Sequence, residues 1–120
     1  MIKVIKNQTV IDEADNMGKK ITEIIGRTNT KTDQLSIAKI SSPKGWTEPG
    51  QTPKFDEYTT VSKGTLRIET KEGSVDIEAD QSVIIEKNTW VKYSTPHDGG
   101  AEYIAICLPA FSLTLANRDK

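Results

Sequence analysis

Residues 66–77 alternate between apolar and polar side chains on both sides of a glycine, and this alternation strongly limits the folds open to the chain. Leu66 and Ile68 alternate with charged residues before Gly73, and Val75 begins the same alternation after it. A period of two places successive side chains on opposite faces of a β-strand, and a glycine between two such runs marks a turn. The sequence therefore predicts a β-hairpin with one buried face and one solvent-exposed face.

The rest of the chain contains further short strand candidates separated by segments rich in Pro, Gly, Asn and Asp. These candidates are 2–5, 21–25, 35–40, 57–62, 82–86, 90–94 and 102–108. Many short strands at close spacing indicate an all-β sandwich or jelly roll. The best helix candidate is a short N-terminal segment at 11–19, although Gly18 weakens it, and residues 112–120 are expected to form a turn or tail.

Length and charge limit the classes of protein to which the chain can belong. Its 120 residues suffice for one domain with a single core. Lys and Arg total 16 against 17 Asp and Glu. This balance indicates no excess of positive charge that would bind nucleic acid or an anionic membrane. No apolar stretch approaches the roughly 20 residues of a membrane helix. The single cysteine, Cys107, forms no internal disulfide and fits a cytoplasmic location.

The segment that ends at Gly64 resembles the first motif of the small single-domain cupins. That motif has two histidines, then a glutamate, and then a glycine. Glu57 and Gly64 stand here at the glutamate and glycine positions, whereas Gln51 and Pro53 stand at the two histidine positions. This segment therefore keeps the spacing of the motif but contains neither of its two histidines.

A second segment, residues 80–91, resembles the second cupin motif. Asp80 and Asn88 occupy its two glycine positions, Glu86 its proline and Val91 its histidine. Asp and Asn tolerate a positive φ better than other non-glycine residues, so the turns are expected to persist. The resemblance implies an all-β double-stranded β-helix, the jelly-roll cupin barrel. It also implies one cupin domain over residues 1–120 with a barrel core at about 20–110.

The substitutions at the ligand positions argue against the metal centre that is usual in this family. Pro53 and Val91 carry no donor atom, so only Glu57 and Gln51 remain. Two oxygen ligands are too few for zinc, iron or nickel, which favour imidazole or thiolate. We therefore expect no metal and no other cofactor. The single histidine, His97, lies in a predicted turn and is expected to be solvated.

Glu57 and Tyr93 are the strongest candidates for a site. The alternation of Glu57, Thr59 and Val61 points the carboxyl into the barrel, where apolar neighbours would raise its pKa and suit it to acid–base catalysis. The alternative is a purely structural Glu57 that fills the vacated ligand position. Tyr93 shares the parity of Val91, so it either offers its hydroxyl to a ligand or packs as an aromatic. Gln51 would help to orient a ligand.

The remaining aromatic residues suggest packing and a partner surface. Trp46 and Phe55 are expected in the core, with the mouth of the barrel as the alternative. Trp90 and Tyr58 should face away from the pocket, where exposed aromatics favour a homodimer. Cys107 is expected to be buried and inert. Because the strand at 102–108 is apolar on both faces, the direction of its Tyr103 is not determined by the sequence.

Three functions are compatible with these patterns. The first is a metal-free cupin barrel that binds a small polar or carbonyl-containing molecule through Gln51, Glu57 and Tyr93. The second is a small cupin enzyme, either an isomerase or cyclase that transfers protons through Glu57 or a weakly liganded metal enzyme. The third is a structural or regulatory dimer with a vestigial pocket. An open cavity with Glu57 at its base would favour the first two, and a filled barrel the third.

Overall fold

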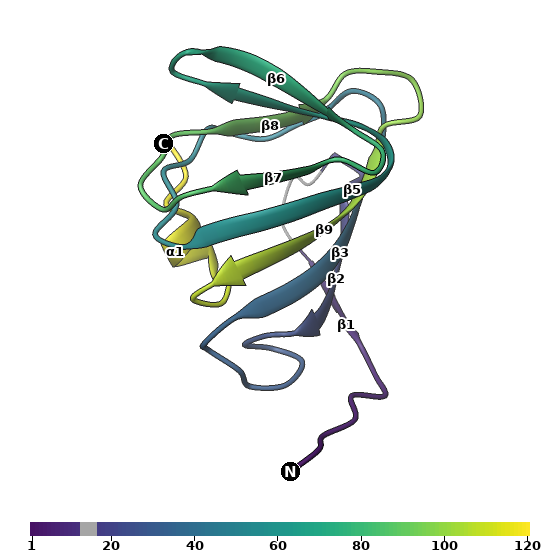
Figure 1. Ribbon diagram of the computed structural model, residues 1–120, viewed down its shortest axis with the longest axis vertical. Coiled ribbons are helices and arrows are strands. Elements are labelled where there is room, and N and C mark those ends of the chain that lie inside the picture. The colour runs from purple at the N-terminus through teal and green to yellow at the C-terminus, as the bar shows by residue number, and fades with distance from the viewer. Residues whose placement is uncertain (13–16) are drawn as a thin grey trace.

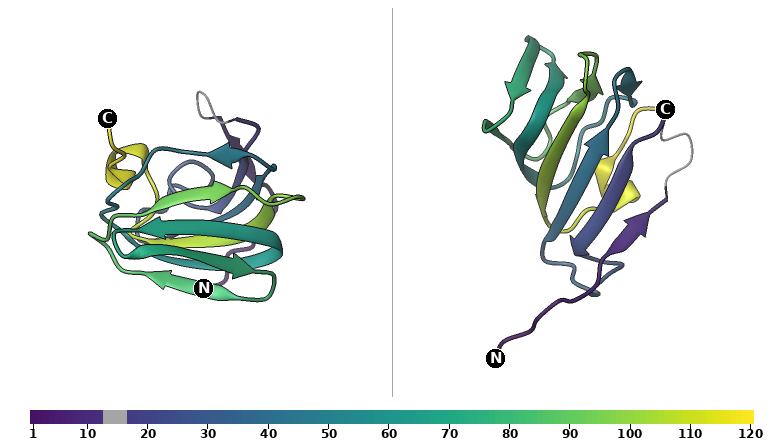
Figure 2. Two further views of the ribbon diagram at one scale, coloured as in Figure 1. Left: turned by 90° about the horizontal axis from the view of Figure 1, so that it is seen from above. Right: turned by 90° about the vertical axis from the view of Figure 1, so that its right-hand side faces the viewer.

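The computed structural model describes residues 1–12 and 17–120, which form an antiparallel β-sheet that curls on itself, with a short helix on its concave side (Figures 1 and 2). The strands are β1 (Thr9–Ile11), β2 (Lys20–Ile25), β3 (Ser36–Ser42), β4 (Trp46–Thr47), β5 (Asp56–Thr70), β6 (Gly73–Glu78), β7 (Ser82–Ile85), β8 (Lys92–Thr95) and β9 (Ala101–Leu108); the helix is α1 (Leu113–Ala116). This architecture confirms the all-β fold that the sequence predicts.

The long strand β5 joins two walls of the curled sheet. The strand order is β1-β2-β3-β9-β5-β8-β4, and β6 and β7 also pair with β5. The first half of β5 pairs with β9 and β7, and its second half pairs with β6 and β8 (Figure 1). A strand shared in this way turns the sheet around an interior that both walls face.

A glycine in the middle of β5 lets the strand pass from one wall to the other. Gly64 has φ +73°, and the register between β5 and β9 shifts between Val61 and Lys63. Such an irregularity bends a strand and increases its twist. The turn residues expected from the second motif behave as predicted, because Asp80 and Asn88 have φ of 70° and 69°.

The predicted hairpin is formed by β5 and β6. Leu66 pairs with Ile77 and Ile68 with Val75. The first three of these side chains are buried, whereas Val75 is exposed near the tip of the hairpin. Burying one face of such a pair contributes about 25 cal/mol for each Å² of apolar surface removed from water.

The core has two parts. The larger lies between the walls and consists of Trp46, Val61, Leu66, Ile68, Ile77, Ile85, Val91, Tyr93, Ala101 and Tyr103. In the smaller part, α1 packs Ala116 against Phe55 and Cys107, with Phe111 and Leu115 beside them. Trp46 and Phe55 are therefore core residues, as the sequence favours, and Cys107 is buried as expected.

The N-terminal expectations require correction. Residues 2–5 form no strand, and residues 1–8 are exposed and extend away from the barrel (Figure 1). The edge strand is instead β1, which pairs with β2. In the helix candidate at 11–19, Ile11 ends β1 and Met17 and Gly18 form a turn, while residues 13–16 lie outside the described part. A period-two apolar pattern needs a partner edge to become a strand, and β1 takes the available edge of β2.

Within the described ranges, no helix is long and apolar enough to cross a membrane.

Candidate functional site

A cavity of about 320 Å³ lies inside the curled sheet. Its lining comes from the inward faces of β2, β3, β9, β5 and β8, together with α1 and the segments beside it. The lining residues are Ile11, Lys19, Ile21, Glu23, Arg27, Thr28, Ser36, Ala38, Ile40, Trp46, Glu48, Gln51, Glu57, Tyr93, Tyr103, Ala105, Cys107, Phe111, Ser112, Leu113 and Arg118. Gln51, Glu57 and Tyr93, which the sequence singled out, all lie on this lining.

The strand register explains why the interior is hollow at this place. Ala38 of β3 pairs directly with Ala105 of β9, so two methyl groups face the interior side by side. The neighbouring row on one side is larger and contains Tyr103 paired with Ile40. The row on the other side, Ser36 paired with Cys107, is also small, so these two rows leave a depression across the sheet beside the larger row of Tyr103 and Ile40.

Glu57 lies at one end of this depression, and two hydroxyl groups hold its carboxyl. Thr59 Oγ1 and Tyr93 Oη both donate to Glu57 Oε2, at 2.8 and 3.1 Å. On the other oxygen, Oε1, the Cys107 sulfur lies at 3.9 Å. The carboxyl is deep in the protein but keeps surface that is accessible from the cavity. Tyr93 is therefore both an interior aromatic and a hydrogen-bond donor.

Burial sets the protonation of this cluster. It raises the pKa of Glu57, because desolvation disfavours the carboxylate more than the bonds from Thr59 and Tyr93 stabilise it. Burial also raises the pKa of Tyr93 and of Cys107, and the nearby Glu57 carboxyl adds to both effects. The hydroxyl and thiol thus stay neutral, and Glu57 is the group at this end of the cavity suited to exchange a proton.

Replacing Glu57 with glutamine is expected to flatten the pH dependence of stability. The native pKa is raised above 4.5, so the folded carboxyl keeps its proton where the unfolded chain has lost it. The resulting stabilisation is fully present below the unfolded pKa and is lost as the pH rises through the native pKa. The advantage of Glu57→Gln in free energy of unfolding should therefore grow with pH, which urea unfolding at several pH values measures. Parallel stability curves for the two proteins would contradict this assignment.

Charged residues that the sequence patterns did not indicate lie at another part of the lining. Lys19 Nζ and Arg118 Nη2 both donate to Glu48 Oε2, at 3.0 and 3.2 Å, and the side chains of Lys19 and Glu48 are 6% and 11% exposed. Arg118 Nε also donates to Gln51 Oε1 at 3.4 Å. Lys19 Nζ lies 4.9 Å from the centre of a Trp46 ring. No local motif links these positions, so only the fold brings them together.

The position of Gln51 follows from backbone pairing. Its backbone forms isolated bridges with both Val91 and Arg118, which ties the two cupin motifs to the C-terminal segment. Val91 is buried in the core and Pro53 is buried as well. Over the described part of the chain, no group of three or more His, Cys, Asp or Glu residues is placed to hold a metal ion.

Of the other residues considered from the sequence, His97 and Trp90 lie outside the cavity lining, whereas Tyr103 is part of it. His97 Nε2 lies 2.9 Å from Asp76 Oδ2, where Arg67 and His97 together lower the pKa of Asp76 to about 2. Tyr103 is buried and faces the cavity, with its hydroxyl 3.0 Å from Ser42 Oγ. Trp90 faces away from the cavity as expected. It is half-buried, and its Nε1 donates to Oδ2 of Asp119 in the C-terminal segment at 2.9 Å.

Comparison with known proteins gives one relative in sequence and many in structure. No family model matches the chain. The chain is 35% identical over 102 residues to the endoribonuclease YbeY of Myxococcus xanthus, an alignment that covers 85% of this chain and 35% of that protein. The chain thus spans about a third of the length of the curated relative that it matches.

The solved structures agree on the fold. The nucleoside dehydratase Pac13 of Streptomyces superposes with a TM-score of 0.74 at 13% identity, over all of this chain and 91% of that one. A cupin from Methanocaldococcus jannaschii with a double-stranded β-helix gives 0.68 at 14% identity, over 89% and 94%. The EutQ protein of Clostridium difficile gives 0.65 at 21% identity, over 77% and 63%. The chain therefore has the RmlC-like double-stranded β-helix fold of the cupins.

Proposed function

We propose that this protein is a metal-free cupin that binds a small polar or carbonyl-containing molecule in the cavity beside Glu57. The observation that carries the proposal is a protonatable carboxyl, fixed by two hydroxyls, at the end of a largely apolar cavity. Binding sites for small molecules typically combine apolar walls with a few fixed polar groups. A barrel filled with side chains would have favoured a vestigial pocket, whereas this open cavity favours ligand binding or catalysis.

The proposed recognition follows from the arrangement around Glu57. Thr59 and Tyr93 both donate to Oε2, whereas only the weak thiol donor of Cys107 approaches Oε1, at 3.9 Å, so Oε1 is the oxygen that a ligand would meet. A protonated carboxyl donates one hydrogen bond, and a ligand carbonyl is a suitable acceptor. Gln51, held by Arg118, would supply an amide group elsewhere on the lining.

A second candidate function is proton transfer on the bound molecule. It is favoured by the raised pKa of Glu57, because a carboxyl that holds its proton to higher pH is suited to general acid–base catalysis. A solved neighbour with this fold is a nucleoside dehydratase, and three of its variants are described with uridine. Dehydration also requires a proton to be moved, so this fold supports such chemistry without showing it for this chain.

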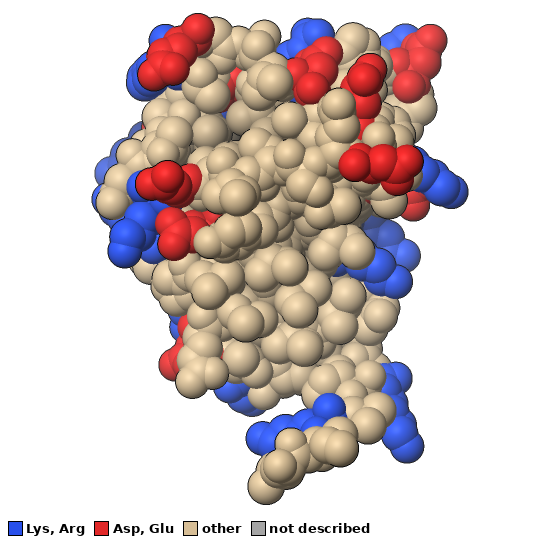
Figure 3. All heavy atoms as spheres, viewed as in Figure 1, with Lys and Arg blue, Asp and Glu red and all other residues tan. Residues whose placement is uncertain are grey.

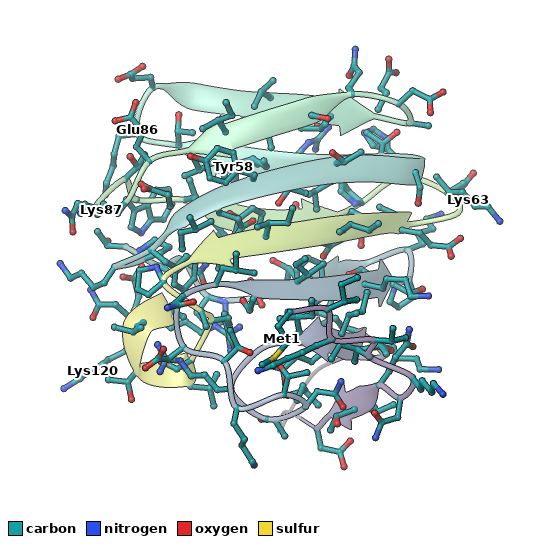
Figure 4. All side chains as sticks on the ribbon, turned by 60° about the horizontal axis from the view of Figure 1, so that its bottom comes forward. Met1, Tyr58, Lys63, Glu86, Lys87 and Lys120 are labelled. Carbon is teal, nitrogen blue, oxygen red and sulfur yellow. The ribbon has the colours of Figure 1, made fainter. Side chains whose placement is uncertain are left out.

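The expected homodimer remains a proposal, as does a cytoplasmic location. The outer face of the wall formed by β7, β5 and β9 carries the exposed apolar residues Tyr58, Ile84, Ile104 and Leu108. Figure 3 shows few charges over this face, and Figure 4 shows Tyr58 on it. Trp90, by contrast, is covered in part by the C-terminal segment of its own chain, so Tyr58 is the better contact candidate of the two.

The test compares two probes of similar shape, cyclohexanone and methylenecyclohexane, on chelator-treated protein. Only the ketone accepts a hydrogen bond, so the proposal expects cyclohexanone to bind at least about fivefold more tightly, as measured by protein-observed NMR. Glu57→Leu should abolish this preference. Glu57→Gln keeps a hydrogen-bond donor but cannot release a proton, so it should keep binding and lose any catalysis.

Tyr93→Phe separates the carboxyl from its hydroxyl partner, because it removes a hydroxyl from the cluster and leaves the carboxyl in place, so this variant should keep the preference for the ketone. Equal binding of the two probes to wild-type protein would contradict recognition of a carbonyl. Binding that requires an added metal ion, and that chelator abolishes, would contradict the metal-free proposal.

A further inference from the structure

We propose that Arg27 binds a carboxylate on the ligand whose carbonyl or hydroxyl reaches Glu57, so that the site selects small oxo or hydroxy acids. This inference rests on the proposed function and adds a second anchoring point at another part of the cavity. Both residues belong to the lining of the same cavity. Arg27 follows β2, whereas Glu57 lies on β5.

Arg27 has hydrogen-bonding capacity that the protein does not use. Its Nε donates to the Ala110 carbonyl at 3.2 Å, which fixes the plane of the guanidinium. In the part of the chain that the structure describes, Arg27 has no other hydrogen-bond partner and no ion pair. Both Nη groups thus stay available on a half-buried side chain that lines the cavity.

The loop that carries Arg27 is held in place by the protein itself. The Glu23 carboxylate accepts hydrogen bonds from the backbone amides of Thr28 and Asn29, each at 3.1 Å to Oε2. Thr30 N and Thr32 N donate to the Gly26 carbonyl at 3.2 and 2.9 Å. Glu23 therefore organises the loop through its backbone amides and forms no ion pair with Arg27, and binding an anion would need little further ordering.

The strand register places Arg27 and Glu57 at a distance that one small molecule can span. Glu57 pairs with Cys107, and Cys107 pairs with Ser36 of β3, the strand beside β2. Three strand spacings, about 14 Å along the sheet, separate β5 from β2. Arg27 lies two residues beyond the end of β2, and its side chain and that of Glu57 line the same cavity. The paired alanines of β3 and β9 lie beside this path, so the middle of the ligand should be slim and apolar.

The chemistry of the guanidinium favours a carboxylate at this position. The two Nη groups form a planar fork that matches the two oxygens of a carboxylate. A phosphate monoester carries about −1.5 to −2 charges at neutral pH, which one arginine does not balance. The other two cations on the lining, Lys19 and Arg118, already share the carboxylate of Glu48.

The experiment uses a series of unbranched oxo acids, 4-oxopentanoate, 5-oxohexanoate and 6-oxoheptanoate, each compared with its uncharged methyl ester. At least one acid should bind the wild-type protein about tenfold more tightly than its ester in calorimetry, because charge-assisted hydrogen bonds are the stronger ones. Arg27→Met keeps the packing of the stem and should bind acid and ester equally. Arg27→Lys should retain part of the preference for the acid.

The matched control is Lys20→Met, which removes the same charge from an exposed position of β2 outside the cavity lining and should leave the preference unchanged. Retention of the full preference by Arg27→Met would overturn the role of Arg27, and tighter binding of a matched phosphonate would overturn the assignment to carboxylates. In both cases the esters would still bind and the proposed function would stand. If neither acids nor esters bind while cyclohexanone does, the role of Arg27 fails and the proposed function stands; if cyclohexanone also fails to bind, both proposals fail.

Discussion

Replacing Ala105 with leucine should abolish ligand binding while the protein remains folded. Ala105 faces Ala38 across the β3–β9 pair, and this pairing of small side chains creates the depression beside Glu57. An isobutyl group in place of the methyl would occupy the space that we assign to the ligand. The expected loss of affinity for cyclohexanone is at least about 100-fold, because the isobutyl group would clash with a ligand that contacts Glu57.

The control for this effect is Ala105→Ser, which adds a single small group at the same position and should bind within a few-fold of the wild type. Thermal unfolding of Ala105→Leu should show a cooperative transition near that of the wild type, since the side chain enters empty space instead of a packed core. A cooperatively folded Ala105→Leu protein that binds the probe as tightly as the wild type would place the ligand elsewhere.

Replacing Gly64 with alanine should produce the largest loss of stability. Gly64 has φ +73°, and an added Cβ would lie 2.0 Å from the Gly100 carbonyl oxygen. Relieving this contact requires the paired strands β5 and β9 to move apart where β5 passes between the walls. Left-handed backbone strain and this backbone clash together should lower the free energy of unfolding by at least about 3 kcal/mol, as measured by urea denaturation.

Gly45→Ala separates the two causes. Gly45 also has a positive φ, +86°, but an added Cβ there meets no atom within 4 Å. Backbone strain alone should therefore lower the free energy of unfolding of this variant, by about 1–2 kcal/mol. Equal losses for the two variants would show that the approach of Gly64 to Gly100 is unimportant.

The sequence alone determined the fold and part of the site. Alternation of side chains is a local property, so the hairpin over 66–77 was predictable, whereas the exposure of Val75 near its tip was not. The turn residues Asp80 and Asn88 were predictable because few residue types tolerate a positive φ. Parity along single strands likewise placed Glu57 and Tyr93 inside the barrel, where their side chains meet.

Only the tertiary structure decided the rest of the site. The cavity exists because Ala38 and Ala105 meet across two strands distant in sequence, and neither alanine is unusual in its own strand. The direction of Tyr103 was unreadable from an apolar strand, and pairing with β3 and β5 turned it inward. At the N-terminus, the apolar pattern at 2–5 found no partner edge, because a strand forms only where another strand accepts its hydrogen bonds.

The positions of the charged residues on the cavity lining were likewise decided by the tertiary structure. Lys19, Glu48 and Arg118 come from three distant segments, and Arg27 lies in a loop whose conformation depends on the Glu23 carboxylate. Local spacing determines which face of a strand a side chain occupies, so strand parity was readable from the chain. The partner of a side chain across the barrel depends on strand order and closure, and these arise only when the whole sheet folds.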